Sequence, residues 1–309
     1  MIFQRSLAKN VNISGIGLHT GARINMRMRP ATADTGIIFH RTDGDTTVSI
    51  KACSQNVVDT RMATVIGRNG VTVSTIEHLM AALAAFSIDN LHIDIDGPEV
   101  PVLDGSAAPF VREFQHVGVS TLGEPRKFIA IRKPLEIIEG EKRISIIPSR
   151  FFRITFDIAF DHPAISVQNH SFKFDTESFC KDIASSRTFG FLHEVEYLKA
   201  NGLARGGSLE NAVVVDDNGV MNPEGLRYHN EFVRHKILDA VGDFSLLGAP
   251  LLGHIRAFKA GHDLNSKMVK LIEDNPDHWV YVDFTEEALR EAQRVFSGAR
   301  ATEFVFNKA

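Results

Sequence analysis

Cysteine is scarce in this chain, and its scarcity narrows the possible chemistry. The 309 residues include two cysteines, Cys53 and Cys180, and no C-x-x-C motif. Neither a disulfide framework nor a thiolate zinc site is therefore indicated. Any metal ion must instead be held by nitrogen and oxygen ligands.

A long apolar run is also missing. No stretch approaches the roughly 18 apolar residues needed to span a bilayer. The first ten residues, MIFQRSLAKN, contain no apolar core of signal-peptide length. We therefore expect a cytoplasmic protein without a transmembrane segment. We also expect it to act as a monomer.

The chain has no excess of basic residues. It carries 34 basic and 38 acidic residues, a net charge of −4. A general nucleic-acid binder normally carries a basic excess, so we expect no nucleic-acid partner, although a local basic pocket for a phosphate remains compatible. With 44% apolar and 23% charged residues, the composition is that of an ordinary globular protein.

The apolar pattern predicts two similar halves, each ending in helix, strand, loop and helix. In the first half we expect strands at 23–29, 48–52, 71–74 and 91–95, and helices at 75–86 and 107–117. In the second half we expect strands within 127–147 and at 152–160 and 254–259, and helices at 231–247 and 264–274. The alternative is a chance similarity between two ordinary stretches.

This pattern predicts an α+β fold with two similar domains, each a sheet with two helices on one face. We expect the first domain at 1–121 and the second at 126–309, joined by a linker within 118–125 (GVSTLGEP). A βαβ-like segment near 190–225 is predicted to be an insertion in the second domain.

The strongest local signal is the run from His235 to Asp239 (HKILD), with Asp243 four residues further on. On a helix these three side chains lie along one face. An imidazole and a carboxylate one turn apart can bind one divalent ion. A surface His–Asp pair is the alternative, but the apolar residues around this polar stripe favour a position facing a cleft.

A second signal is the pair Glu77-His78 at the start of a predicted helix. Ser74 and Glu77 fit the S/T-x-x-E capping box, so Glu77 could serve only as a cap, and His78 could be a core histidine. If this helix faces the one in the second half, however, His78, His235 and Asp239 would meet. Three protein ligands and one open position are typical of catalytic zinc.

A third signal is His262, which follows a predicted strand in the run KAGH. Asp243 is a candidate partner for one of its ring nitrogens; a solvent-exposed loop histidine is the alternative. Zinc lowers the pKa of its bound water to about 7. Glu77 could then take a proton during attack on a carbonyl, and a cationic His262 could protonate an amine leaving group. These roles predict an amide hydrolase.

Two other motifs do not add to this chemistry. Residues 14–21 (SGIGLHTG) are glycine-rich, but they lack both the G-x-G-x-x-G spacing and the P-loop lysine. A tight turn that presents His19 is the simpler interpretation. Ser106 has no G-x-S-x-G elbow around it and is predicted to cap a helix.

Five segments together resemble the UDP-3-O-acyl-N-acetylglucosamine deacetylase (LpxC) family, zinc enzymes of lipid A synthesis in Gram-negative bacteria. They are STIEHLMAAL, PVLDGSA, SSRTFGF, EFVRHKILDAVGD and FKAGHDLN, in the family's order. The resemblance extends from GIGLHTG to at least residue 270; the tail beyond Trp279 is less diagnostic. It implies mainly antiparallel sheets whose helices face each other across the active-site cleft.

The resemblance also implies a reaction and its catalytic residues. The substrate would be UDP-3-O-(3-hydroxyacyl)-N-acetylglucosamine, whose N-acetyl group is hydrolysed to release acetate. The cofactor would be Zn²⁺, although Fe²⁺ suits the same ligands. The metal ligands would be His78, His235 and Asp239. The catalytic residues would be Glu77 as general base, His262 as general acid, Asp243 to orient it and Thr188 to donate to the oxyanion.

The substrate contacts that the resemblance implies fall into two groups. Lys236 and Lys259 would contact the diphosphate, with His19 nearby. Phe189 and Phe191 would border the sugar and acyl region, and residues 190–215 would form an apolar passage for the fatty acyl chain. These lysines are the point charges that a diphosphate needs.

Two other functions remain open from the sequence. A zinc peptidase or other amidohydrolase is one, although the chain lacks H-E-x-x-H and its Glu77 precedes His78. The second is a non-catalytic carrier of UDP-sugar or lipid with the same fold. The presence of Glu77 and His262 beside the three ligands argues against it, because a carrier needs no acid or base.

Overall fold

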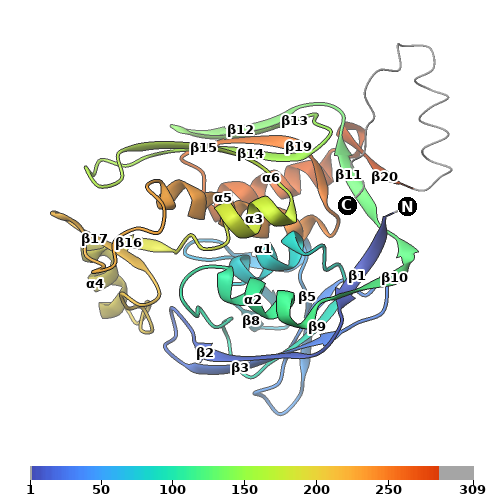
Figure 1. Ribbon diagram of the computed structural model, residues 1–309, viewed down its shortest axis with the longest axis horizontal. Helices are drawn as coiled ribbons and strands as arrows, with labels where there is room; N and C mark the ends of the chain where they lie inside the picture. The colour runs from blue at the N-terminus through green and yellow to red at the C-terminus, as the bar shows by residue number, and fades with distance from the viewer. Residues whose placement is uncertain (1, 285–309) are drawn as a thin grey trace.

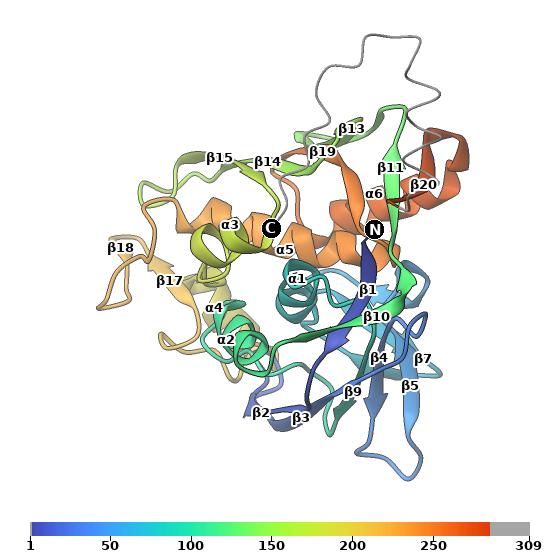
Figure 2. The same ribbon diagram turned by 45° about the vertical axis from the view of Figure 1, so that its right-hand side comes forward.

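Two β-sheets enclose a central layer of helices in the computed structural model of this chain, which describes residues 2–284 (Figure 1). Helix α1 packs against helix α5 within this layer. Figure 2 shows the same order of layers after a 45° turn. The arrangement confirms the predicted α+β class, with mainly antiparallel sheets and helices that face each other.

The first sheet forms because its strands alternate apolar and polar residues. In β3 (Arg23–Pro30), Ile24, Met26 and Met28 are buried, and the polar residues between them are exposed. This period of two places one face of the strand on the core and the other in solvent. The expected strand at 23–29 is therefore confirmed.

The strands of the first sheet follow the order β2-β3-β9-β4-β5, antiparallel except for the β9–β4 pair. The other bounds are β2 (Val11–Ile16), β4 (Ile37–Arg41), β5 (Val48–Lys51) and β9 (Leu91–Ile95). Helices α1 (Glu77–Ala85) and α2 (Ala108–Val117) lie over one face (Figure 1). A small sheet precedes α1: β6 (Val57–Asp59), β7 (Val65–Arg68) and β8 (Val71–Val73). The predicted elements of this half are confirmed to within two residues at each end.

The second sheet is built around β19 (Leu251–Phe258). The path runs β12-β13-β19-β11-β20. Outside this path, β14 pairs in parallel with β19 and antiparallel with β15. The bounds are β11 (Lys127–Ile131), β12 (Leu135–Glu139), β13 (Lys142–Ile147), β14 (Phe152–Ala159), β15 (Val167–Lys173) and β20 (Trp279–Asp283). Its helices are α3 (Thr176–Asp182), α5 (Glu231–Phe244) and α6 (His262–Asp274). Short 3-10 helices lie at 245–247 and 276–278 in this half and at 54–56 in the first half.

Helix α1 is buried on almost every side because it lies between its own sheet and α5. Eight of its nine residues are buried, as expected for a helix that is apolar all round. The two helices approach closely at Gly242, where an added Cβ would lie 2.1 Å from the backbone oxygen of Glu77. Only glycine permits this approach.

The segment expected to be a linker is instead a strand. Residues Val119–Pro125 form β10, which pairs antiparallel with β1 (Phe3–Leu7). The alternation in GVSTLGEP is weak, and the partner strand lies more than 100 residues away in the sequence. The hydrogen bonds of that distant partner, rather than local propensity, decide the conformation.

Residues 189–216 follow a β-α-β order; that this segment is an insertion stays a prediction. Strands β16 (Phe189–Phe191) and β17 (Val213–Asp216) pair in parallel, with α4 (Leu192–Ala200) between them and β18 (Gly219–Val220) at the edge. This arm extends away from the helical layer (Figure 1). Within residues 2–284, no helix is long and apolar enough to cross a bilayer.

Candidate active site

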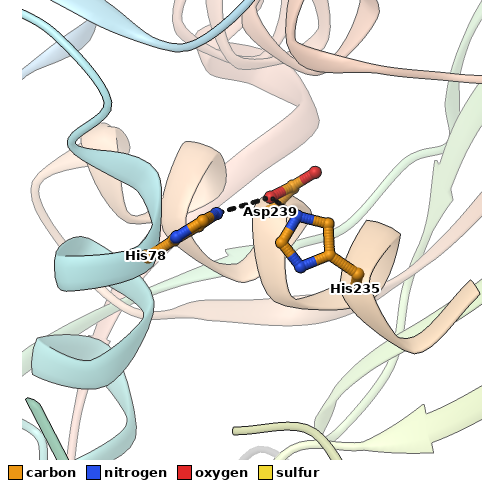
Figure 3. A group of neighbouring side chains, drawn as sticks. All are labelled: His78, His235 and Asp239. Atoms are coloured by element: carbon orange, nitrogen blue, oxygen red, sulfur yellow. Dashed lines mark ion pairs between the residues drawn. The ribbon is translucent and has the colours of Figure 1, made fainter. Parts of the chain in front are cut away.

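Three metal-type side chains meet where α1 crosses α5. His78 comes from the first turn of α1, and His235 and Asp239 lie one turn apart on α5; all three are buried. Their ligand atoms all lie within 4.8 Å of one another. Figure 3 shows the two imidazoles and the carboxylate converging from the two helices. The expected meeting of these two distant helices therefore occurs.

The ring of His235 has a defined orientation. Its Nδ1 lies 3.0 Å from the backbone oxygen of Ser186. A carbonyl oxygen only accepts, so Nδ1 carries the proton and Nε2 is left free to act as a ligand, 3.3 Å from Oδ1 of Asp239. Burial lowers the pKa of His235 to about 3. A neutral imidazole is the form that binds a metal.

Asp239 offers one oxygen that nothing else satisfies. Its Oδ2 accepts a hydrogen bond from Nζ of Lys236 at 2.9 Å. Its Oδ1 is buried, has no hydrogen-bond partner within residues 2–284, and lies 3.6 Å from Nε2 of His78. A buried carboxylate oxygen without a donor is costly, so it indicates a missing partner. A divalent cation between two imidazoles and this oxygen fits that need, and the three residues could hold a metal ion.

Glu77 lies beside this cluster and does not cap its helix through Ser74. The backbone N–H of Ser74 donates to the oxygen of Pro98, and the carboxylate of Glu77 accepts from the backbone N–H of Thr64 at 3.1 Å. The capping-box alternative is therefore wrong. Burial raises the pKa of Glu77, which moves this carboxylate toward the range where it can accept and release a proton.

His262 also lies beside the cluster and faces Glu77. Its Nδ1 lies 3.0 Å from Oδ2 of Asp243, and its Nε2 lies 3.9 Å from Oε1 of Glu77. Burial alone would lower the pKa of His262, but the carboxylates of Asp243, Asp239 and Glu77 outweigh it and raise that pKa to about 9. The imidazole is therefore a cation at neutral pH and can donate a proton from Nε2.

These groups share one cavity of about 320 Å³. Of the predicted site residues, its lining includes His19, Glu77, His78, Thr188, Phe189, His235, Lys236, Asp239 and His262. Asp243 lies behind His262, where it also accepts hydrogen bonds from the hydroxyl of Thr64 (2.5 Å) and the amide of Asn265 (2.9 Å). The structure thus brings together most of the residues that the sequence indicated.

Two predicted substrate contacts lie apart from this cavity. Among the described residues, Lys259 and Phe191 are not part of its lining. Nζ of Lys259 pairs with Oε2 of Glu141 at 2.7 Å. The ring of Phe191 packs on the arm beside Phe160, at 5.8 Å between centroids. Their roles remain predictions.

Sequence reasoning missed several residues that hold the site in place. Thr64 bonds to both Glu77 and Asp243, yet it lies 179 positions from Asp243 in the chain. Glu99 accepts from the backbone N–H of His19 at 2.9 Å and so holds the turn that presents this histidine. Neither Thr64 nor Glu99 belongs to a local motif. The one signal in the sequence is a polar residue within an apolar stretch, which suggests a buried hydrogen bond but not its partner.

A larger cavity of about 640 Å³ lies elsewhere in the fold, beside the C-terminal ends of α1 and α5. Within the described residues, its lining contains three aspartates but no histidine. It therefore lacks the nitrogen ligands and the acid–base pair of the smaller cavity. The candidate active site is therefore the smaller of these two cavities, and the chemistry of the lining residues distinguishes it.

Known proteins resemble this chain along nearly its whole length. A family model described as UDP-3-O-acyl N-acetylglycosamine deacetylase matches residues 4–274. A protein of Syntrophotalea carbinolica named UDP-3-O-acyl-N-acetylglucosamine deacetylase is 66% identical over 288 residues, 93% of each chain. Proteins of the same name from a Geobacter species (56% identity, 93% of this chain and 94% of the relative) and Myxococcus xanthus (50%, 96% and 94%) are also similar.

Proposed function

This chain belongs to the UDP-3-O-acyl-N-acetylglucosamine deacetylase family, and we propose that its cavity of about 320 Å³ hydrolyses the N-acetyl group of UDP-3-O-(3-hydroxyacyl)-N-acetylglucosamine. The family's reaction is a step of lipid A biosynthesis. The observation that carries the assignment is the buried His78–His235–Asp239 cluster beside the acid–base pair Glu77 and His262.

The metal that we propose is zinc, with iron(II) as the alternative, because both accept two imidazoles and one carboxylate. The unsatisfied Oδ1 of Asp239 and the neutral ring of His235 support this choice. When bound, zinc would supply Lewis-acid chemistry that makes water nucleophilic near neutral pH and polarises the substrate carbonyl.

The proton transfers would be divided between the two residues that flank the cluster. Glu77 would take a proton from the attacking water as its oxygen bonds to the acetyl carbon. The hydroxyl of Thr188, on the cavity wall, would donate a hydrogen bond to the carbonyl oxygen as negative charge develops there. His262 would give its Nε2 proton to the sugar nitrogen as the C–N bond breaks. The products are acetate and the free amine.

The substrate contacts follow the charge and the aromatic residues around the cavity. Lys236 and His19 line it and would meet the diphosphate. Lys259, outside this lining, would have to leave its present partner to join them. The partner of Lys259 is Glu141, whose side chain is 80% exposed. Such a pair is weak, so a diphosphate could replace it.

An aromatic path leads from the cavity to the inserted arm. Phe189 lines the cavity and contacts Phe160 at 5.9 Å, and Phe160 contacts Phe191 at 5.8 Å between ring centroids. We propose that the acyl chain follows these rings, because their apolar faces would shield it from water.

Metal analysis combined with acetate release from the UDP-sugar substrate tests this function. We expect about one zinc per chain and acetate release that a chelator abolishes. Peptide substrates serve as the control for a zinc peptidase. Peptide cleavage without deacetylation, or tight binding of the UDP-sugar by the zinc-loaded chain without any acetate, would contradict the proposal.

A further inference from the structure

One peptide group lies between two side chains of α5 next to the metal cluster. It joins Ser186 to Arg187. Its carbonyl oxygen accepts from Nδ1 of His235 at 3.0 Å, and its N–H donates to Oε1 of Glu231 at 2.9 Å. Glu231 and His235 are four residues apart on the same helix, so they lie on one face. A single peptide therefore connects a buried carboxylate to a candidate metal ligand.

The carboxylate of Glu231 is fully desolvated and fully satisfied. Its exposed fraction is 0%. Besides the Arg187 N–H, it accepts from Nε of the Arg187 side chain at 2.9 Å and from the backbone N–H of Arg227 at 2.6 Å. The guanidinium is equally buried and balances the charge, so the group can remain a carboxylate inside the protein.

The charge at one end of this chain of hydrogen bonds affects the other end. An anion that accepts from a peptide N–H polarises the peptide, which makes its carbonyl oxygen a stronger acceptor. That carbonyl then holds the Nδ1 proton of His235 more firmly. The ring is fixed in one tautomer and orientation, and Nε2 becomes a better ligand. Direct bonds from a carboxylate to a metal-bound histidine have this effect in many metalloproteins.

We propose that Glu231 is a positioning residue that acts on His235 through the Ser186–Arg187 peptide and thereby raises the affinity of the site for its metal ion. The inference rests on the proposed function, because it requires a metal at His78, His235 and Asp239. It assigns to Glu231 a role that its ion pair with Arg187 alone would not require.

A purely structural ion pair makes a different prediction. Arg187 has a second carboxylate partner, Glu224, whose side chain is 55% exposed. Glu224 bonds to the guanidinium, but among the described residues it has no bond to the Ser186–Arg187 peptide. Glu224→Gln therefore removes a carboxylate from Arg187 and leaves the peptide connection intact, which makes it the matched control.

The test is the zinc affinity of the purified full-length chain, measured by competition with a chromophoric chelator. We expect Glu231→Gln to weaken zinc binding about 10-fold, the lower end of the effect of losing a direct outer partner, because glutamine removes the negative charge but keeps an acceptor oxygen. Glu224→Gln should keep the affinity of the unaltered chain. Cobalt substitution gives a second readout, because the visible absorption bands of the bound ion should shift in Glu231→Gln and not in Glu224→Gln.

A second variant covers the case in which Glu231→Gln does not fold because Arg187 keeps an unbalanced charge. Arg187→Met combined with Glu231→Gln removes both charges together, so no buried charge is left unpaired. We expect this double variant to fold and to bind zinc as weakly as Glu231→Gln.

Two results would overturn the inference: a folded Glu231 variant that binds zinc as tightly as the unaltered chain, or an equal loss in Glu224→Gln. His235→Ala separates this failure from a failure of the proposed function. If His235→Ala loses zinc and the Glu231 variants do not, only the inference fails. If His235→Ala keeps its zinc, the metal site itself is misplaced.

Discussion

The close contact between α1 and α5 at Gly242 should control both the stability and the metal affinity of this protein. At Gly242, an added Cβ would lie 2.1 Å from the backbone oxygen of Glu77, whereas real Cβ atoms stay at 3.0 Å or more. Gly242→Ala must therefore move α5 from α1 by about 0.9 Å, the difference between these distances. Overpacking of this kind costs roughly 1–3 kcal/mol.

The same displacement should weaken metal binding. His78 is on α1 and Asp239 is on α5, with 3.6 Å between Nε2 and Oδ1. Metal–ligand distances tolerate only about 0.2 Å of change, so a shift of about 0.9 Å cannot be absorbed without loss of a ligand or strain. We therefore expect Gly242→Ala to lower both the free energy of unfolding and the zinc affinity.

Urea unfolding and zinc competition measure the two effects separately. Gly123→Ala is the control, because no atom of the described part of the chain lies within 4 Å of a Cβ at that position; it should leave both quantities close to those of the unaltered chain. The reasoning is refuted if Gly242→Ala is destabilised no more than the control, or if it is destabilised but binds zinc with unchanged affinity.

Three further variants test the cavity. Glu77→Gln should keep its metal but lose about 10²–10⁴ in kcat; full activity with metal bound would contradict the role of general base. Asp239→Ala should lose the metal, measured by elemental analysis after dialysis, because one of three ligands is gone. Asp243→Asn should lower the pKa of His262 from about 9, so the alkaline limb of the kcat/KM profile should move to lower pH, and an unmoved limb would refute this. The pKa of His262 is raised in the folded protein from 6.5 to about 9. The stability that its neighbouring carboxylates provide is therefore complete below pH 6.5 and is lost as the pH rises through about 9. Asp243→Asn should make this loss smaller in urea unfolding measured between these two pH values.

Local pattern determined much of what could be predicted. The alternation in RINMRMR required a half-buried strand, because side chains on a strand alternate between its two faces. The apolar run after Glu77 required a buried helix, and the spacing of His235 and Asp239 placed both on one helical face. Each of these conclusions depends on residues only a few positions apart.

The tertiary structure decided what depends on distant partners. Residues 119–125 became a strand because β1 supplies their hydrogen bonds, although their own alternation is weak. Lys259 forms an ion pair with Glu141 and does not line the cavity. The hydroxyl of Thr64 donates a hydrogen bond to Asp243, which lies 179 residues away in the sequence. Sequence motifs indicated the candidate metal ligands, but the approach of α1 to α5 at Gly242 brings them together. Periodicity follows from the geometry of a single element, whereas a site between elements depends on how their surfaces pack.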